Sequence, residues 1–399
     1  MSGATMAASR LGVDAKYLGW TGMAFGALAW FVALPPLLIR TPIPTLLLAL
    51  GAVLLGVAAI QGGERRVGWL AIAAGVIGAI GGVVATQSGE GNLEDVFAWS
   101  ALIAAMLRFA TPLAFAALGG ILCERSGVIN IGLEGMMLMG AFFGIFGADL
   151  TGSWLLGALI GMAAGGAMGL LHAVLSVTLR ADQVVGGTAI NFLAIGITGY
   201  VYIAHYGARG TPRDVPRAPD VTLPGIESIP FFGDAIGEAN VLTWIALLLV
   251  PLLALYLFRT PGGLRLRSVG EKPRAADSVG VPVLRTRYLA VTASGLLAAL
   301  GGVYLSIALA GVFNEMMTDG RGFIALAAVI FGNWRPAGAL AGALLFGFSS
   351  AVAQRLPAFS EPLAVLFQAL PYVVTLVVVA GVIGRSRPPA AIGVPYVKE

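Results

Sequence analysis

Charged residues and cysteine are both scarce in this chain of 399 residues. Only 11% of the residues are Asp, Glu, Lys or Arg, whereas a soluble domain usually has about 25%. Because so few charges cannot cover a water-facing surface, the composition excludes a soluble globular protein. The single cysteine, Cys123, rules out an intrachain disulfide, and its apolar neighbours indicate an inert packed thiol.

Histidine is also rare, and no nucleotide-binding pattern occurs. His172 and His205 are isolated, so no His/Cys cluster predicts a metal site, and each is expected to be structural. The phosphate-binding pattern G-x-x-x-x-G-K-[ST] is absent, and no soluble domain could bind a nucleotide. A membrane enzyme is disfavoured because no carboxylates cluster inside the apolar runs. If ATP drives this protein, another chain must hydrolyse it.

Apolar residues make up 58% of the chain, and the mean hydropathy is +0.90. They occur in uncharged runs of about 20 residues, the length that a helix needs to cross the hydrocarbon core of a membrane. We therefore predict an all-α polytopic membrane protein with about twelve spans. The segment at 322–333 is too short to span alone and is expected to be a half-helix or a tilted segment. The predicted spans are 19–39, 43–61, 67–86, 97–122, 130–150, 154–179, 186–206, 241–259, 288–312, 322–333, 336–354 and 363–383.

The loops between these spans predict their direction. The loop at 259–287 is strongly basic, and the loop at 207–240 is acidic. Since cytoplasmic loops carry an excess of Lys and Arg, the first should face the cytoplasm and the second the outside. Counting spans from these loops places both termini in the cytoplasm, and Arg40 is the clearest exception. The net charge of +4 thus reflects a membrane protein among lipids, with no nucleic acid partner expected.

Two polar stretches interrupt apolar segments. Residues 118–135 carry Glu124, Arg125, Asn130 and Glu134, and residues 332–338 read Gly-Asn-Trp-Arg-Pro-Ala-Gly. Glu124 and Arg125 fit a cytoplasmic turn. Glu134 lies inside the next apolar run, where a charge is costly, so it should face protein or a water-filled path, or bond to a broken helix end. Paired Gly-rich interruptions are typical of the central site of transporters built from inverted repeats, although the two halves resemble each other only weakly.

A third stretch, residues 263–281, forms a basic loop. Pro273 followed by Arg-Ala-Ala-Asp predicts a short helix with proline in its first turn and with Ala275 and Ala276 on its surface. An ordinary positively charged cytoplasmic loop would explain the charge. A helix with small exposed residues also suits the docking of a partner protein, and both interpretations remain open at this point.

Two of these stretches resemble a known family. The sequence from Gly120 to Met137 is similar to the signature of permease subunits of bacterial ABC importers, and 269–280 resembles their coupling segment. The branch is the ribose and branched-chain amino acid permease superfamily. Within it, the likeness is greatest to nucleoside and simple-sugar permeases that work with basic-membrane-protein-type binding lipoproteins. The resemblance covers about 97–384 and departs from the family pattern at Lys272, where Asn is expected.

The resemblance implies a type II ABC importer-like core of about ten spans with an inverted repeat. The implied domains are an N-terminal extension with about three spans at 1–96, the permease core at 97–384, the coupling loop at 263–281 and a cytoplasmic tail at 385–399. The implied partners are an ABC ATPase, a second related permease chain and an extracytoplasmic binding lipoprotein. No cofactor is expected on this chain, because ATP and Mg would bind the ATPase. The location would be the bacterial cytoplasmic (inner) membrane.

The family pattern places coupling to the ATPase at six residues of the loop: Gly270, Glu271, Arg274, Ala275, Ala276 and Gly280. The resulting hypothesis is an ATP-driven importer of nucleosides or a related small polar solute such as a simple sugar. Amide and aromatic side chains suit a nucleobase, so five residues are candidates to line the path: Asn130, Glu134, Asn191, Phe192 and Asn314. The alternative is an ion- or proton-coupled transporter that acts without an ATPase, with Glu134 as its titrating group.

Overall fold

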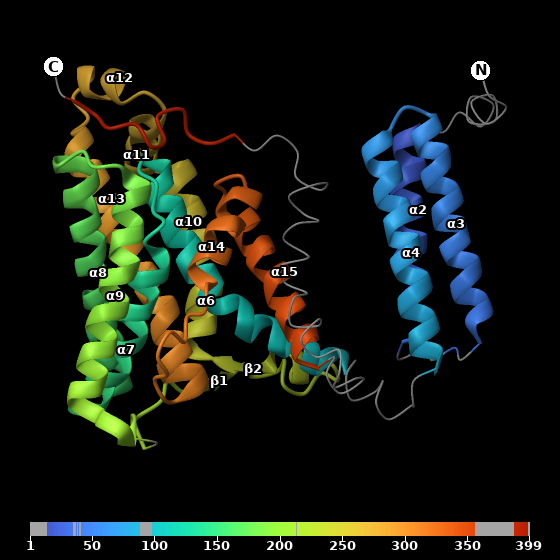
Figure 1. The fold of residues 1–399 in the computed structure, drawn as a ribbon, viewed down its shortest axis with the longest axis horizontal. Helices are drawn as coiled ribbons and strands as arrows, with labels where there is room; N and C mark the ends of the chain where they lie inside the picture. The colour runs from blue at the N-terminus through green and yellow to red at the C-terminus, as the bar shows by residue number, and fades with distance from the viewer. Residues whose placement is uncertain are drawn as a thin grey trace. The chain divides into compact units, whose positions relative to one another are not determined.

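The computed structural model describes residues 14–34, 37, 39, 41–87, 98–212, 214–355 and 387–397. Within these ranges the chain is mostly helical, which confirms the all-α prediction (Figure 1). A two-stranded antiparallel sheet pairs β1 (Asp220–Thr222) with β2 (Glu238–Asn240). The span predicted at 363–383 and the exceptional Arg40 both lie outside the described residues.

The described chain divides into two compact units, the first of which contains the helices α2 (Ala15–Phe31), α3 (Pro42–Gln61) and α4 (Arg65–Gln87). Small residues bring these helices together. A Cβ added at Gly26 would lie 2.5 Å from the carbonyl carbon of Ala74. Leucine side chains such as Leu47 and Leu54 on α3 point outward. This pattern of small residues inside and large apolar residues outside is typical of membrane helices.

The second unit comprises residues 103–351 and the C-terminal residues that follow 384. At its centre lies α7 (Leu133–Thr151), whose most apolar stretch is 72% buried, the highest value among the candidate spans described. Close packing depends on glycine here too, since a Cβ at Gly140 would overlap the backbone of Ala299. The other long helices of this unit are α6 (Trp99–Arg125), which begins in the first unit, α8 (Trp154–Ala173), α9 (Gln183–Tyr206), α10 (Val241–Arg259), α13 (Val283–Val303) and α15 (Pro336–Arg355).

Nine helices in the described ranges are long and apolar enough to cross a membrane. Two of them continue into π-helical turns, α8 into η1 (Val174–Thr178) and α13 into η4 (Tyr304–Ala310). The apolar helix α14 (Arg321–Phe331) has only 11 residues, which confirms the prediction of a half-helix. The first predicted span corresponds to α2, which has 17 residues.

The half-helix α14 is delimited by residues with left-handed backbone angles. Gly320, with φ of 76°, precedes its first turn, and Asn333 and Trp334, with φ of 52° and 54°, follow its end. Pro336 then starts α15, a position that suits proline because the first N–H of a helix has no partner within it. Residues 332–335 of the polar stretch therefore form a tight turn between two helices, and 336–338 belong to the first turn of α15.

The two ends of the second unit differ in character (Figure 1). At one end lie the helices α11 (Pro261–Glu271) and α12 (Pro273–Ser278), together with the C-terminal residues 387–397. The sheet β1–β2 lies at the opposite end. Another chain that binds at α12 and one that binds at the sheet would therefore meet opposite ends of this unit.

Candidate functional site

The segment expected to couple to an ATPase folds as two short helices. Thr260 caps the first of them, because its Oγ1 accepts a hydrogen bond of 3.1 Å from the Gly263 N–H, and Pro261 occupies the first turn. Helix α12 begins at Pro273, as the sequence predicted. Such a short helix is marginal in isolation, so tertiary contacts must fix it.

The six predicted coupling residues fall into two groups. Glu271, Arg274, Ala275 and Gly280 are exposed. Gly270 and Ala276 are buried beneath them. The expectation that Ala276 lies on the helix surface is wrong: it is 3% exposed because it packs with Val269, Val283 and Tyr396. The small size of Ala276 lets α12 lie close to its support.

Gly270 joins the coupling segment to the end of α6. A Cβ at this position would overlap the carbonyl oxygen of Arg125, so only glycine permits the approach. The side chain of Arg125 lies with its guanidinium 6.0 Å from the centroid of the Phe258 ring on α10. The last turn of α6 is therefore in direct contact with the segment that the family resemblance assigns to coupling.

Glu134 holds the beginning of α14. Its carboxylate accepts a hydrogen bond of 2.8 Å from the Gly320 N–H and one of 2.6 Å from the Gly322 N–H. The first N–H groups of a helix have no partner within it and carry partial positive charge, so a carboxylate stabilises them. Of the roles expected for Glu134, the structure confirms bonding to a broken helix end.

A pocket of about 280 Å³ opens beside this contact and brings together Glu134, Asn191 and Phe192. Asn191 is held in place, since its Oδ1 accepts from the Gly135 N–H at 2.8 Å and its Nδ2 donates to the Ile131 carbonyl at 3.1 Å. Phe192 is 70% exposed in the described chain and lines this pocket. The remaining lining residues are Gly135, Leu138, Thr188, Ile195, Met316, Thr318, Asp319, Gly320 and Phe323.

The other two predicted path residues lie elsewhere. Asn130 is completely buried and donates from Nδ2 to the Ser294 hydroxyl at 3.0 Å, which links the start of α7 to α13. Asn314 is exposed in the loop before α14, where its carbonyl accepts from the Met317 N–H. Neither residue lines the pocket beside Glu134.

The turn after α14 is held by the same polar stretch that supplies Glu134. The Trp334 indole N–H donates to the Glu124 carboxylate, and the Arg125 guanidinium donates to the carbonyls of Trp334 at 3.1 Å and Asn333 at 3.5 Å. Residues 118–135 thus bind both ends of the half-helix. Sequence reasoning placed Glu124 and Arg125 in a turn and missed this contact. The sequence signal that could have revealed this contact was the polar pair Asn333-Trp334 in the second stretch.

The buried histidine and cysteine have structural positions, as expected. His172 Nε2 lies 2.9 Å from the carbonyl oxygen of Ile129, so it contacts the break between α6 and α7. Cys123 is buried among Val128, Ala173 and Val291. Among the described residues, no group of three or more His, Cys, Asp or Glu side chains could hold a metal ion.

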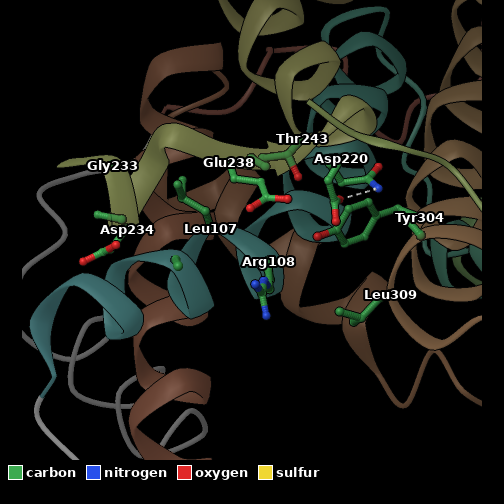
Figure 2. Close-up of a pocket in the computed structure, with 14 residues that line it drawn as sticks. Leu107, Arg108, Asp220, Gly233, Asp234, Glu238, Thr243, Tyr304 and Leu309 are labelled. Atoms are coloured by element: carbon green, nitrogen blue, oxygen red, sulfur yellow. Dashed lines mark hydrogen bonds between the residues drawn. The ribbon is translucent and has the colours of Figure 1, made fainter. Parts of the chain in front are cut away.

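A larger pocket, of about 500 Å³, lies near the β1–β2 end (Figure 2). Figure 2 shows Asp220 and Glu238 from the strands near Tyr304, with Arg108 of α6 facing the same pocket. Asp220 accepts a hydrogen bond of 3.1 Å from Asn240. The acidity of this loop is evident in the sequence, but the pocket is not, because its walls come from residues about 200 positions apart.

These features are those of a polytopic membrane protein with a short apolar helix between interrupted segments. The family model described as "Branched-chain amino acid transport system / permease component" matches residues 102–379, and the chain belongs to this family of permeases. The matched region begins after the three helices of the first unit, and it contains the coupling segment, Glu134 and both interrupted stretches.

Three curated relatives show which members of this family the chain resembles. The chain is 42% identical over 310 residues to the guanosine ABC transporter permease protein NupQ of Bacillus subtilis, which covers 75% of this chain and 97% of that protein. It is 38% identical over 309 residues to the nucleoside ABC transporter permease protein NupC of Lactococcus lactis, with the same coverage. A second Bacillus subtilis protein, the guanosine ABC transporter permease protein NupP, is 23% identical over 292 residues, which cover 70% and 81% of the two chains. No solved structure matches the chain significantly.

Proposed function

We propose that this permease moves nucleosides into the cell as the membrane-spanning subunit of an ATP-driven importer, with ATP and Mg bound by a separate ATPase chain. The observation that carries the proposal is the exposed face of α11 and α12. Glu271, Arg274 and Ala275 are presented there while Gly270 joins the segment to α6. A docking site with a rigid connection to a spanning helix is what a partner ATPase needs to transmit a conformational change.

We assign nucleosides as the solute because of two relatives, NupQ and NupC, and because of the pocket beside Glu134. The names of both relatives specify guanosine or nucleoside transport. The pocket is lined by Phe192 and Phe323 together with Thr188, whose hydroxyl donates to the Val184 carbonyl and can still accept a hydrogen bond. Aromatic faces stack on bases, whereas hydroxyl groups can bond to sugar and base edges. Its volume of about 280 Å³ is near the lower end of the range for small-molecule pockets, about 300–1,000 Å³.

The direction of the chain is part of the proposal. The coupling segment and both termini face the cytoplasm of a bacterial cell, and the β1–β2 end faces the outside, where an extracytoplasmic binding lipoprotein delivers the solute. The basic loop at 259–287 and the acidic loop at 207–240 support this orientation. Labelling of single introduced cysteines with an impermeant thiol reagent in whole cells tests it.

A second, related permease chain completes the transport path. Two Bacillus subtilis proteins carry the name guanosine ABC transporter permease, and this chain is 42% identical to one and 23% identical to the other. That difference supports a pair of two different permease chains, in which this chain corresponds to NupQ, the relative with 42% identity.

The function is tested by reconstitution in liposomes with the ATPase, the second permease and the binding protein. We expect ATP-dependent uptake of labelled guanosine, and glucose serves as the competing solute class. Phe192→Ala should lower uptake at subsaturating nucleoside about tenfold, because stacking on a base contributes roughly 1–3 kcal/mol. Tyr200→Ala is the matched control, since Tyr200 is 76% exposed on the same helix and lies outside the pocket. ATP-independent uptake by this chain alone would contradict the proposal.

The structure disfavours the ion-coupled alternative. Such a transporter needs a buried carboxylate that is free to bind a proton or an ion. Both oxygens of Glu134, the candidate for this role, accept hydrogen bonds from backbone N–H groups at the α14 end, so this carboxylate already has a structural role.

A further inference from the structure

The C-terminal residues 387–396, called here the C-terminal strap, cross the coupling segment. The Ala391 N–H donates to the Gly270 carbonyl at 2.9 Å, and the Ala390 N–H donates to the Glu271 carboxylate at 3.2 Å. The strap thus binds the last turn of α11 through both backbone and side chain. In Figure 1 it lies at the same end of the unit as α11 and α12.

The strap also binds the two turns that follow α6 and α14. The Gly393 N–H donates to the Gly127 carbonyl at 3.0 Å, just after the end of α6. The Arg387 N–H donates to the Asn333 side chain at 3.0 Å, in the turn after α14. One short segment therefore contacts the coupling helix and both interrupted stretches.

A buried arginine fastens the far end of the strap. Arg287 is 1% exposed, and its guanidinium donates from Nε to the Ser126 carbonyl at 3.2 Å and from Nη1 to the Val394 carbonyl at 3.0 Å. Hydrogen bonds from a charged group to buried carbonyls are among the stronger ones in proteins. The strap is thereby fixed to α13 and to the turn after α6.

The strap supplies part of the support beneath α12. Tyr396, which is 7% exposed, packs in one apolar cluster with Val269 of α11, Ala276 of α12 and Val283 of α13. Because α12 has only 6 residues, its position depends on this cluster and not on its own helical stability. Removal of the tyrosine ring would leave α12 without one of its few apolar partners.

We infer that the C-terminal strap is a positioning element of the coupling site, which holds α11 and α12 against the end of α6 so that movement of the docked ATPase reaches the spanning helices. The inference rests on the proposed function, because it takes the ATPase as the partner of α12. It assigns a role to a segment that neither the coupling motif nor the pocket includes. Without the strap, the contact at Gly270 would remain, but α12 would lose part of its support and transmit less of the ATPase movement to α6.

The test uses the complete importer in liposomes and measures ATP hydrolysed per nucleoside transported. The variants are a chain ending at Pro388 and Tyr396→Ala, and the controls are Tyr396→Phe, which keeps the ring, and Val397→Ala, which is 48% exposed. We expect the ATP-to-solute ratio to rise about tenfold in both variants, since loss of the Tyr396 ring leaves a cavity in the small apolar cluster that supports α12. Both controls should keep the ratio of the unchanged chain.

Two further measurements make the outcome decisive. Hydrogen exchange on the permease alone should show faster exchange in residues 273–278 of both variants, whatever the solute. Copurification with the ATPase should be retained. An unchanged ATP-to-solute ratio in both variants overturns the inference, and so does loss of copurification, which would indicate a docking role instead. If the unchanged importer transports no nucleoside while hydrogen exchange responds as expected, the proposed substrate fails and the strap does not.

Discussion

The two hydrogen bonds from the beginning of α14 to Glu134 allow a prediction whose energetic magnitude follows from the structure. In Glu134→Gln, the amide oxygen can still accept from one of the two N–H groups, but the amide NH₂ faces the other and cannot accept. One charge-assisted hydrogen bond of 2.6–2.8 Å is therefore lost, together with the attraction between the carboxylate and the helix end. Hydrogen bonds to charged groups contribute about 1.5–3 kcal/mol, and the helix-end attraction about 0.3–1 kcal/mol.

Glu134 is only partly buried, so water compensates for some of this loss. A net cost of about 1.5 kcal/mol corresponds to roughly tenfold more frequent opening of the first turn of α14. Hydrogen exchange resolved by mass spectrometry measures this directly in peptides that contain 318–331. We expect about tenfold faster exchange there and little change in α7 itself, and uptake should fall in parallel.

The matched control is Glu315→Gln, which makes the same chemical change at an exposed residue of the loop before α14. It should leave exchange in 318–331 unchanged. The reasoning would be refuted by a Glu134→Gln chain that shows normal exchange in α14 and normal uptake. Equal effects of the two substitutions would also refute it, because they would point to net charge and not to the capture of the helix end.

Three other substitutions test the remaining contacts. Trp334→Phe removes the indole N–H that bonds to Glu124, and we expect faster hydrogen exchange at the turn after α14, while Trp69→Phe, an exposed tryptophan in the first unit, should have no effect there. Gly270→Ala would force a Cβ onto the Arg125 carbonyl and should reduce uptake at least about tenfold, whereas Gly51→Ala, with open space around its Cβ, should be neutral in uptake assays. Arg125→Lys cannot reproduce the forked contact with the carbonyls of Asn333 and Trp334, so a several-fold loss of uptake at normal membrane level is expected.

The sequence predicted most helices well because the signal for a membrane span is local. The predicted span 241–259 coincides with α10, and the half-helix at 322–333 differs from α14 by one or two residues at each end. The start of α13 was placed five residues late, at 288 instead of Val283. Arg285 and Arg287 interrupt the apolar run there, and only contacts with Ser126 and Val394, far away in the sequence, make Arg287 a buried residue.

The residues of the site were predicted less completely than the helices, because their positions depend on contacts between distant parts of the sequence. Glu134 was found because a charge inside an apolar run needs a partner, and Asn191 and Phe192 lie in the same pocket. Asn130 has the same composition signal as Asn191, yet it faces Ser294 in the interior. Which side of a helix faces a path depends on the packing of neighbouring helices, and nearly uniform apolar spans contain little information about it.

The contacts of residues 118–135 suggest how a docking event could reach the solute path. Arg125 touches the coupling segment through its carbonyl and the turn after α14 through its guanidinium. Glu134, only nine positions later, holds the opposite end of α14 beside the pocket. A half-helix fixed at both ends by one polar stretch must follow that stretch when it moves, whereas a helix held at one end could pivot. Movement of the coupling segment is thus expected to shift α14 as a unit, and with it the wall of the pocket formed by Thr318, Asp319 and Phe323.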